Sequence, residues 1–290
     1  RPSTPDRRRW GQRWQARGPL RPRGDVSRDG ESLRDLGDGL AARAWSQGRV
    51  LLLEPEGLEL LGSLGVGVPA WSVVDGPGAV PDVDGFPGDR VVVKLLSPLV
   101  AHRTELGGIR VVERASHAVV RAVEELARVS PDPAARFLVE EYVPHEGEPG
   151  AELLLGARCS HEFGVVVTLA PGGVAAEALA DLARPGAGSL VWAVGAMSAE
   201  RLEHDLAASV LGSLLTGSLR GRPPRVTARA LAEFATAFGE AAAEVIPRPF
   251  SDVEVNPLVF VEGRPVALDA LVRLAPAPAE PAAGDEIAAY

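Results

Sequence analysis

Lys94 is the only lysine among the 30 basic residues of the chain, and it stands inside an apolar run at residues 91–96. A charged amine in an apolar strand is costly unless it meets an anion, so Lys94 needs a partner. A compact ammonium group suits a phosphate, which would explain why this position is not an arginine. The alternatives are a buried Asp or Glu as the partner, or a lysine stem that reaches water.

A polar loop at residues 97–108 follows Lys94 directly and ends in Gly107 and Gly108. Glycines allow backbone N–H groups to approach phosphate oxygens, and the Ser, Arg and Thr side chains of this loop add donors. The loop therefore favours a phosphate as the partner of Lys94.

His102 is the one histidine of five that lies in such a loop. An imidazole there can act as a base or as a nucleophile toward phosphorus, although a plain loop contact is the alternative. The other four histidines are predicted to lie on the surface; they are His117, His145, His161 and His204.

Asn256, the only asparagine of the chain, and Asp269 stand on two segments that flank a tight turn at residues 262–263. On adjacent antiparallel strands they offer an amide oxygen and a carboxylate, which Mg²⁺ accepts together with water and substrate phosphates. Glu254 lies two residues before Asn256 and faces the same side, so it is a further candidate ligand. The alternative is a solvated hairpin, although asparagine is disfavoured in strands.

The composition restricts the class of protein. The chain has 290 residues, a hydrophobic content of 46% and a net charge of −9, which is typical of a globular protein and speaks against a nucleic-acid surface on its folded part. The single cysteine, Cys159, allows no internal disulfide and lacks a zinc-binding pattern. No apolar run is long enough to span a bilayer or to act as a signal peptide. We expect a cytoplasmic protein that binds neither membrane nor nucleic acid.

The residues that could do chemistry are predicted to lie on strands and on the loops that follow them. Residues 90–96 have the pattern of a buried central strand. Other strands are expected at residues 66–74, 109–113, 137–143, 152–158, 164–169, 252–261 and 265–273, with turns at 147–150 and 262–263. Helices are expected at residues 54–64, at 116–127 with Ser116 as the cap, and at 174–182, 199–219 and 227–245, and a loop is expected at 75–89.

These elements predict an α+β (α/β) fold with two lobes, hinged near residues 138–143. Frequent hairpins argue against one doubly wound sheet. Residues 1–48, rich in Arg, Pro and Gly, are predicted to be a flexible tail, where a partner or nucleic acid is the alternative to a solvated extension. The further divisions are a subdomain at 49–137 with Lys94 and the glycine loop, a subdomain at 138–274 with the metal hairpin, and a flexible tail at 275–290.

Five stretches at residues 50–273 resemble the ATP-grasp β domain of NDP-forming acyl-CoA synthetases, the family of acetate–CoA ligase (ADP-forming) and succinyl-CoA synthetase. They are VVVKLLSPLVAHRTELGGIRVV, LVEEYVPHEGEPGAELLLGARCSHEFGVVV, PGGVAAEALAD, LLTGSLRGRPP and EVNPLVFVEGRPVALDALVRL. They occur in the order of the family. The resemblance implies two small α/β subdomains that clamp a nucleotide cleft.

The resemblance also implies roles for individual residues. Lys94 matches the phosphate-binding lysine of the family. Gly107 and Gly108 match its mobile glycine loop. Glu140 and Val143 fall at the hinge that holds adenine.

Further matches concern the ribose, the metal and the transferred phosphate. Glu152 matches a carboxylate that contacts ribose, and Asn256 and Asp269 match the magnesium ligands. His102 matches a histidine thought to carry phosphate transiently between the catalytic histidine of the α part and the nucleotide. The sequence departs from the family at the loop 75–89, at APGG in 170–173, and by a shortening near 183–186.

The implied activity is the transfer of phosphate between Mg-ATP and a phosphohistidine within a ligase that forms acid–thiol bonds. The expected cofactors are ATP and Mg²⁺. The chain lacks the CoA-binding domain and the domain with the main phosphohistidine, so we expect a CoA-binding α subunit or domain as partner; Arg1 in place of Met fits a trimmed chain. The alternatives are a nucleotide-binding regulatory or scaffold module that has lost catalysis, and an ATP-grasp ligase that joins a carboxylate to an amine.

Overall fold

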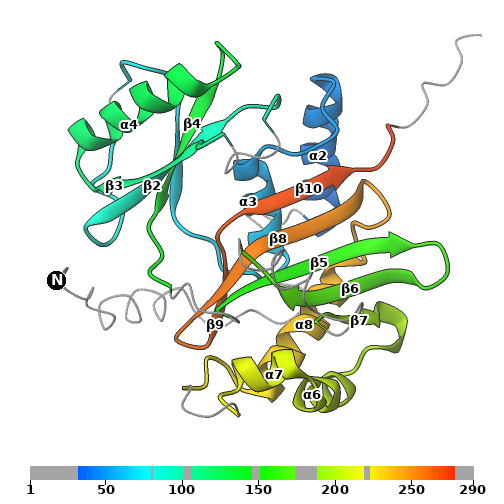
Figure 1. The fold of residues 1–290 in the computed structure, drawn as a ribbon. Coiled ribbons are helices and arrows are strands. Elements are labelled where there is room, and N and C mark those ends of the chain that lie inside the picture. The colour runs from blue at the N-terminus through cyan, green and yellow to red at the C-terminus, as the bar shows by residue number, and fades with distance from the viewer. Residues whose placement is uncertain are drawn as a thin grey trace, which may run out of the picture.

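The computed structural model describes residues 32–79, 81–100, 106–145, 151–173, 188–218 and 223–277. Within these residues the chain forms two antiparallel sheets and the helices that cover them (Figure 1). This combination of helices and antiparallel strands confirms the predicted α+β class.

The smaller sheet carries Lys94 on an inner strand. Its strands are β1 (Trp71–Val74), β2 (Arg90–Leu96), β3 (Ile109–Glu113) and β4 (Arg136–Glu141), in the order β1-β4-β2-β3. Helix α4 (Ser116–Val129) packs against β2 and β3. The bounds of β2 and β3 agree with the predicted ones, because each is an apolar run between loops rich in polar residues and glycine.

The two faces of β2 belong to different cores. Val91, Val93 and Leu95 lie in the core under α4. Lys94 points to the opposite face, since successive side chains of a strand alternate. Its neighbour on β4, Leu138, belongs to the core of the larger unit. Lys94 is therefore directed at the junction of the two sheets.

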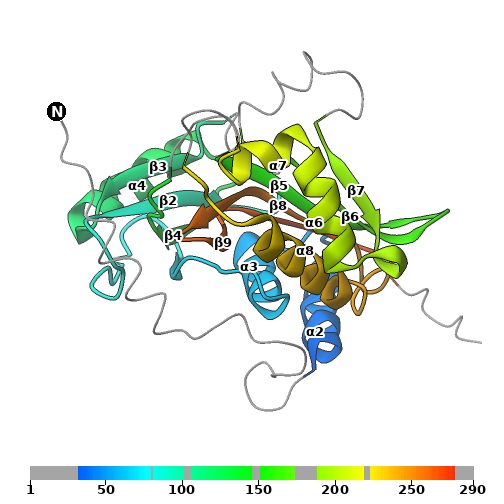
Figure 2. The same cartoon turned by 90° about the horizontal axis from the view of Figure 1, so that it is seen from below.

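The larger sheet runs in the order β10-β8-β5-β6-β7, with β9 paired to β8. Helices α6, α7 and α8 lie across one face of it (Figure 2). The strands are β5 (Glu152–Ser160), β6 (Gly164–Pro171), β7 (Leu190–Ala193), β8 (Phe250–Val261), β9 (Arg264–Ala267) and β10 (Ala270–Leu274), and the helices are α6 (Ala199–Ala208), α7 (Val210–Leu215) and α8 (Ala228–Ala242), with a short 3₁₀ turn η2 (Val194–Ala196).

The larger unit differs from the prediction in three details. The expected C-terminal hairpin is present, but its second strand is interrupted at residues 268–269, so that β9 and β10 pair with β8 separately. The single helix expected at 199–219 is broken at Ser209, whose hydroxyl caps α7. Strand β7 was not predicted, because four residues carry too little periodicity to be read.

Residues 33–46 were predicted as part of a flexible tail, and this prediction is wrong, because they form helix α2 (Leu33–Ser46). Leu36, Leu40 and Ala44 of this helix are buried in the large core. A capping box with Asp35 at Ser32 begins the helix. The helical spacing of these apolar residues was missed beside the Arg/Pro/Gly-rich residues that precede them.

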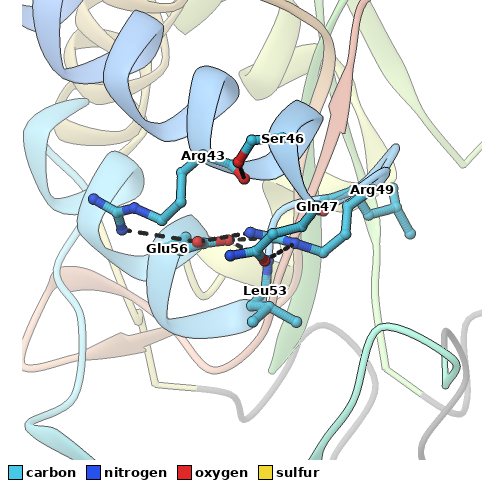
Figure 3. A network of polar contacts seen from close by, with 7 residues as sticks. Arg43, Ser46, Gln47, Arg49, Leu53 and Glu56 are labelled. Atoms are coloured by element: carbon cyan, nitrogen blue, oxygen red, sulfur yellow. Dashed lines mark hydrogen bonds and ion pairs between the residues drawn. The ribbon is translucent and has the colours of Figure 1, made fainter.

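A buried arginine joins α2 to α3 (Glu54–Ser63), the helix that was predicted to begin at Glu54. Arg49 donates to both carboxylate oxygens of Glu56, at 2.7 and 2.9 Å, and to Oε1 of Gln47 at 2.9 Å (Figure 3). The side chains of Arg49 and Glu56 are 5% and 10% exposed. Arg43 approaches the same carboxylate from solvent at 3.8 Å. The bidentate pair holds the start of α3 against the end of α2.

The chain passes from the smaller to the larger sheet between β4 and β5. Strand β4 pairs within the smaller sheet along residues 136–141, so the change of sheet comes later than the boundary at 138 suggested by the sequence. The two strands were predicted to be joined by a turn at 147–150, but they belong to different sheets. Those turn residues lie outside the described residues, as do the helix expected at 174–182 and the tail residues 1–31 and 278–290.

Ser116 does not cap α4 as predicted. The N-cap residue is Ala115, and the Ser116 hydroxyl donates to the carbonyl oxygen of Pro81. In the described part of the chain, none of the helices is long and apolar enough to cross a membrane.

The Arg49–Glu56 pair should contribute strongly to stability. Replacing Arg49 with Ala leaves the buried Glu56 carboxylate without its main partner, so we expect the free energy of unfolding to fall by about 3–5 kcal/mol. Urea unfolding followed by circular dichroism measures this change. The matched control is Arg43→Ala, which removes an exposed arginine near the same carboxylate and should cost less than about 1 kcal/mol. Equal losses in the two variants would contradict the assigned role of Arg49.

Candidate functional site

The ammonium group of Lys94 is bound by oxygen atoms from three different elements. Its Nζ lies 2.6 Å from Oε1 of Glu54 at the start of α3, 2.6 Å from Oε2 of Glu140 on β4, and 2.6 Å from the carbonyl oxygen of Leu268 between β9 and β10. Lys94 is 5% exposed, and both glutamates are 2% exposed. An ammonium group has three N–H donors, so these three acceptors satisfy it completely.

This cluster decides which of the considered partners Lys94 has in the structure. The partners are buried carboxylates, the alternative to a phosphate in the sequence analysis. Two carboxylates face this one ammonium group. A phosphate oxygen can bind Lys94 only in exchange for one of its three acceptors.

The same cluster brings Lys94 close to the predicted metal residues. Leu268, whose carbonyl oxygen binds Lys94, directly precedes Asp269. The backbone N–H of Leu268 donates to the carbonyl oxygen of Pro257 at 2.9 Å, and Pro257 directly follows Asn256. The break between β9 and β10 therefore places the neighbours of Asn256 and Asp269 beside the lysine.

Glu254 lies on β8 among groups of like charge. Its carboxyl is half-buried, and burial is the largest cause that raises its pKa. The negative charges of Asp252 and Asp269 raise the pKa further, and a hydrogen bond with the Asn256 side chain opposes them. A cation among these oxygens would relieve both the repulsion and the cost of burial.

The donors at this end of the hairpin fit Mg²⁺. The amide oxygen of Asn256 and the carboxylates of Asp269 and Glu254 are hard oxygen donors, whereas softer metals prefer imidazole and thiolate. Within the described ranges, no group of three or more His, Cys, Asp and Glu side chains is placed to hold a metal ion. Mg²⁺ takes one or two protein carboxylates and fills its other positions with water and phosphate oxygens.

Glu152, at the start of β5, is enclosed by residues from other segments. Nε2 of His145 lies 3.1 Å from its Oε1. Gly173 lies against the other side of the carboxylate, so closely that a Cβ at this position would overlap Oε2. The N–H of Gly173 donates to Oδ1 of Asn256 at 2.9 Å. Contacts therefore run without a break from the segment between the sheets to the C-terminal hairpin.

His145 was predicted to be a surface residue, and it is exposed in the structure, where it also makes two polar contacts that were not predicted. Its side chain is 25% exposed, and its Nδ1 lies 3.0 Å from the carbonyl oxygen of Val143. The sequence offered one signal, the position of His145 in the connection that leads to Glu152. Spacing alone does not reveal such a contact, because the connection between them has no regular period.

Val143 lies under the C-terminal hairpin. It is 3% exposed and forms a small apolar cluster with residues of β8 and β9, which are Val259 and Val266, with Val261 and Leu268 packed against them. Leu268, whose carbonyl oxygen binds Lys94, packs against this cluster.

The two loop glycines differ in their roles. Gly107 is exposed and has a φ of 62°, which suits a residue without a side chain in a turn. Gly108 is buried, and its carbonyl oxygen accepts a hydrogen bond from Leu95 N at 2.8 Å, so it extends the pairing of β2 with β3. His102 lies outside the described residues.

A pocket of about 340 Å³ opens beside the lysine cluster. Its walls are residues 47–54, residues 95–100 and the start of β10 at Ala270 and Leu271. Glu54 lines it, whereas Glu140, Glu152 and Asn256 do not. The pocket therefore lies on the α3 side of the cluster, next to the segment that leads to His102.

The fold and these residues match a known family. The profile of a family described as an ATP-grasp domain matches residues 43–274. The chain therefore belongs to the ATP-grasp family, and the predicted ATP-grasp fold is confirmed.

The relatives of the chain narrow this class. It is 26% identical over 224 residues to the β subunit of acetate–CoA ligase (ADP-forming) I from Pyrococcus furiosus, a match that covers 76% of this chain and 90% of the relative. It is 28% identical over 164 residues to acetate–CoA ligase (ADP-forming) I from Archaeoglobus fulgidus, covering 54% of this chain and 22% of that protein. The predicted resemblance to NDP-forming acyl-CoA synthetases is confirmed.

Solved structures give the same result. The dinucleotide-forming acetyl-coenzyme A synthetase 1 of Ca. Korarchaeum cryptofilum, in complex with coenzyme A, Ca-AMPCP and HgCl⁺, has a TM-score of 0.67 and 26% identity, covering 82% of this chain and 100% of that chain. A second structure of that protein contains coenzyme A and Mg-AMPPCP, with its phosphohistidine segment pointing towards the nucleotide binding site. Its TM-score is 0.63 at 27% identity, covering 84% of this chain and 100% of that chain.

The Lys94 cluster should be required for stability. Lys94→Met leaves two buried carboxylates without an ammonium group, so we expect a loss of about 3–5 kcal/mol in the free energy of unfolding. The triple variant with Glu54→Gln and Glu140→Gln also removes the excess charge and should recover much of this loss. Guanidinium unfolding at neutral pH compares the two. A triple variant less stable than Lys94→Met would show that charge imbalance is not the cause.

Proposed function

We propose that this chain is the ATP-grasp β component of an ADP-forming acyl-CoA ligase, an enzyme of the class that forms acid–thiol bonds. It passes phosphate between Mg-ATP and a phosphohistidine, and a CoA-binding α subunit or domain completes the formation of acyl-CoA. The observation that carries this proposal is the family match along residues 43–274 together with relatives named as ADP-forming CoA ligases. The match to the β subunit from Pyrococcus furiosus covers 90% of that subunit.

The contacts of the site support a nucleotide that lies along the residues between the two sheets. Glu152 provides a carboxylate for the ribose hydroxyls, and Glu140 and Val143 lie on the adenine side. Asn256 and Asp269 would hold Mg²⁺, which would neutralise charge on the phosphates. Lys94 exchanges one of its acceptors for a phosphate oxygen when the nucleotide binds.

The chemical step is a phosphoryl transfer. The bond between the γ-phosphorus and the bridging oxygen of ATP breaks, a bond from phosphorus to an imidazole nitrogen forms, and ADP leaves with the electron pair. The protein contributes mainly position and charge in such a reaction. Closure of the two sheets around the phosphates excludes water, which would otherwise accept the phosphoryl group.

His102 is the proposed carrier of the phosphate on this chain. Replacing His102 with Ala should abolish transfer of ³²P from γ-labelled ATP to protein histidine in the presence of the α subunit, while binding of Mg-ATP is retained. The matched control is His161→Ala, an exposed histidine in the turn between β5 and β6, which should leave transfer unchanged. Normal labelling in His102→Ala would exclude this role.

The metal pair should determine the affinity for the magnesium complex. We expect Asn256→Ala and Asp269→Ala each to weaken binding of Mg-ATP by roughly tenfold or more in isothermal titration calorimetry, with little effect on ATP in the presence of EDTA. Glu262→Gln, an exposed change in the turn of the same hairpin, is the control. A loss of the same size with and without magnesium would count against the metal assignment.

A regulatory nucleotide-binding module is the second candidate. The observation that favours it is the closed state of Lys94, whose three donors are all used by the protein. Binding of Mg-ATP without labelling of any histidine, with an active α subunit present, would support this candidate over the ligase component.

A further inference from the structure

His145 contacts two acceptors at once from the connection between the sheets. Its Nδ1 lies 3.0 Å from the carbonyl oxygen of Val143, and its Nε2 lies 3.1 Å from Oε1 of Glu152. A carbonyl oxygen and an ionised carboxylate can only accept hydrogen bonds. A neutral imidazole has one N–H, so both contacts are hydrogen bonds only when the ring carries a proton on each nitrogen. In that form His145 bridges the connection to the start of β5 by a charge-assisted hydrogen bond.

The Glu152 carboxylate is confined from its other side as well. Gly173 has a φ of 72° and approaches so closely that any side chain would displace Oε2 of Glu152. Gly173 is itself fixed by its hydrogen bond to Asn256, and the neighbouring Gly172 N–H donates to the carbonyl oxygen of Glu152 at 2.9 Å. The carboxylate is therefore held between a donor and a backbone wall, although its side chain is still 23% exposed.

We infer that His145 is a positioning residue that orients Glu152 for the two hydroxyl groups of a ribose and so sets the preference for ribonucleotides. This inference rests on the proposed function, in which Glu152 contacts the ribose. Two adjacent hydroxyls donate to a carboxylate only when its plane is suitably turned. A free glutamate side chain would lose rotamer entropy on binding them, whereas a glutamate already fixed by His145 and Gly173 has lost it in the folded protein.

The experiment compares Mg-ATP with Mg-2′,3′-dideoxy-ATP, which lacks both hydroxyl groups, by isothermal titration calorimetry. We expect the wild-type chain to prefer ATP. His145→Ala should weaken ATP binding by roughly tenfold, the size expected for one charge-assisted hydrogen bond, and leave dideoxy-ATP binding unchanged. His145→Arg should restore much of the preference, because a guanidinium group also has only donors. His161→Ala is the matched control.

The outcomes separate this inference from the function it rests on. If the wild type binds ATP with the expected preference but His145→Ala weakens both nucleotides equally, His145 has a purely structural role, and the inference fails while the proposed function stands. If the wild type binds both nucleotides equally, the ribose contact at Glu152 is absent and the inference falls with it. If the wild type binds no nucleotide, the proposed function and the inference both fail.

A second variant keeps the test decisive in the event that His145→Ala does not fold.

His145→Gln retains a donor for Glu152 in a side chain of similar polarity, and it should show an intermediate preference for ATP. A His145→Gln variant that folds like the wild type in circular dichroism and shows the full preference would overturn the requirement for two donors.

Discussion

The buried ammonium group of Lys94 is the interaction on which the arrangement of this molecule depends. It binds oxygens from α3, from the smaller sheet and from the break between β9 and β10. Apolar side chains on the same face as Lys94, such as Leu138, make contacts that have no preferred direction. The lysine adds direction, because three N–H donors must meet three acceptors at fixed angles. The two sheets are therefore held together by a buried charge as well as by their apolar contact.

The same charge explains why a polyanion needs help to bind here. Glu54 and Glu140 both face Lys94, and Glu254, Asp252 and Asp269 add carboxylates along the hairpin. A nucleotide triphosphate would be repelled by this field. Mg²⁺ bound to its phosphates would lower their negative charge, so the proposed site suits a magnesium nucleotide better than a free one.

The sequence predicted strands β2 and β3 to the residue, because apolar runs between glycine-rich and polar loops leave little choice. It missed α2, whose four-residue spacing stands next to an Arg/Pro/Gly-rich segment. It named a buried Asp or Glu as one possible partner of Lys94 but could not identify Glu54, which lies 40 residues away in sequence. It placed His145 on the surface, where the residue lies, but could not reveal the contact with Glu152 across an irregular connection. Periodicity reports local structure, and contacts between elements leave no such trace in one sequence.

The APGG segment departs from the family pattern, and this departure changes which groups can bind the phosphates. Pro171 has no backbone N–H to offer a phosphate. The N–H of Gly172 is used by Glu152 and that of Gly173 by Asn256. These two amides therefore connect the end of β6 to β5 and to the C-terminal hairpin, and the glycine at 173 is needed for the close approach of the Glu152 carboxylate. If the nucleotide binds as proposed, the N–H groups of this segment are already used within the protein. Mg²⁺ and Lys94 would then neutralise the phosphates.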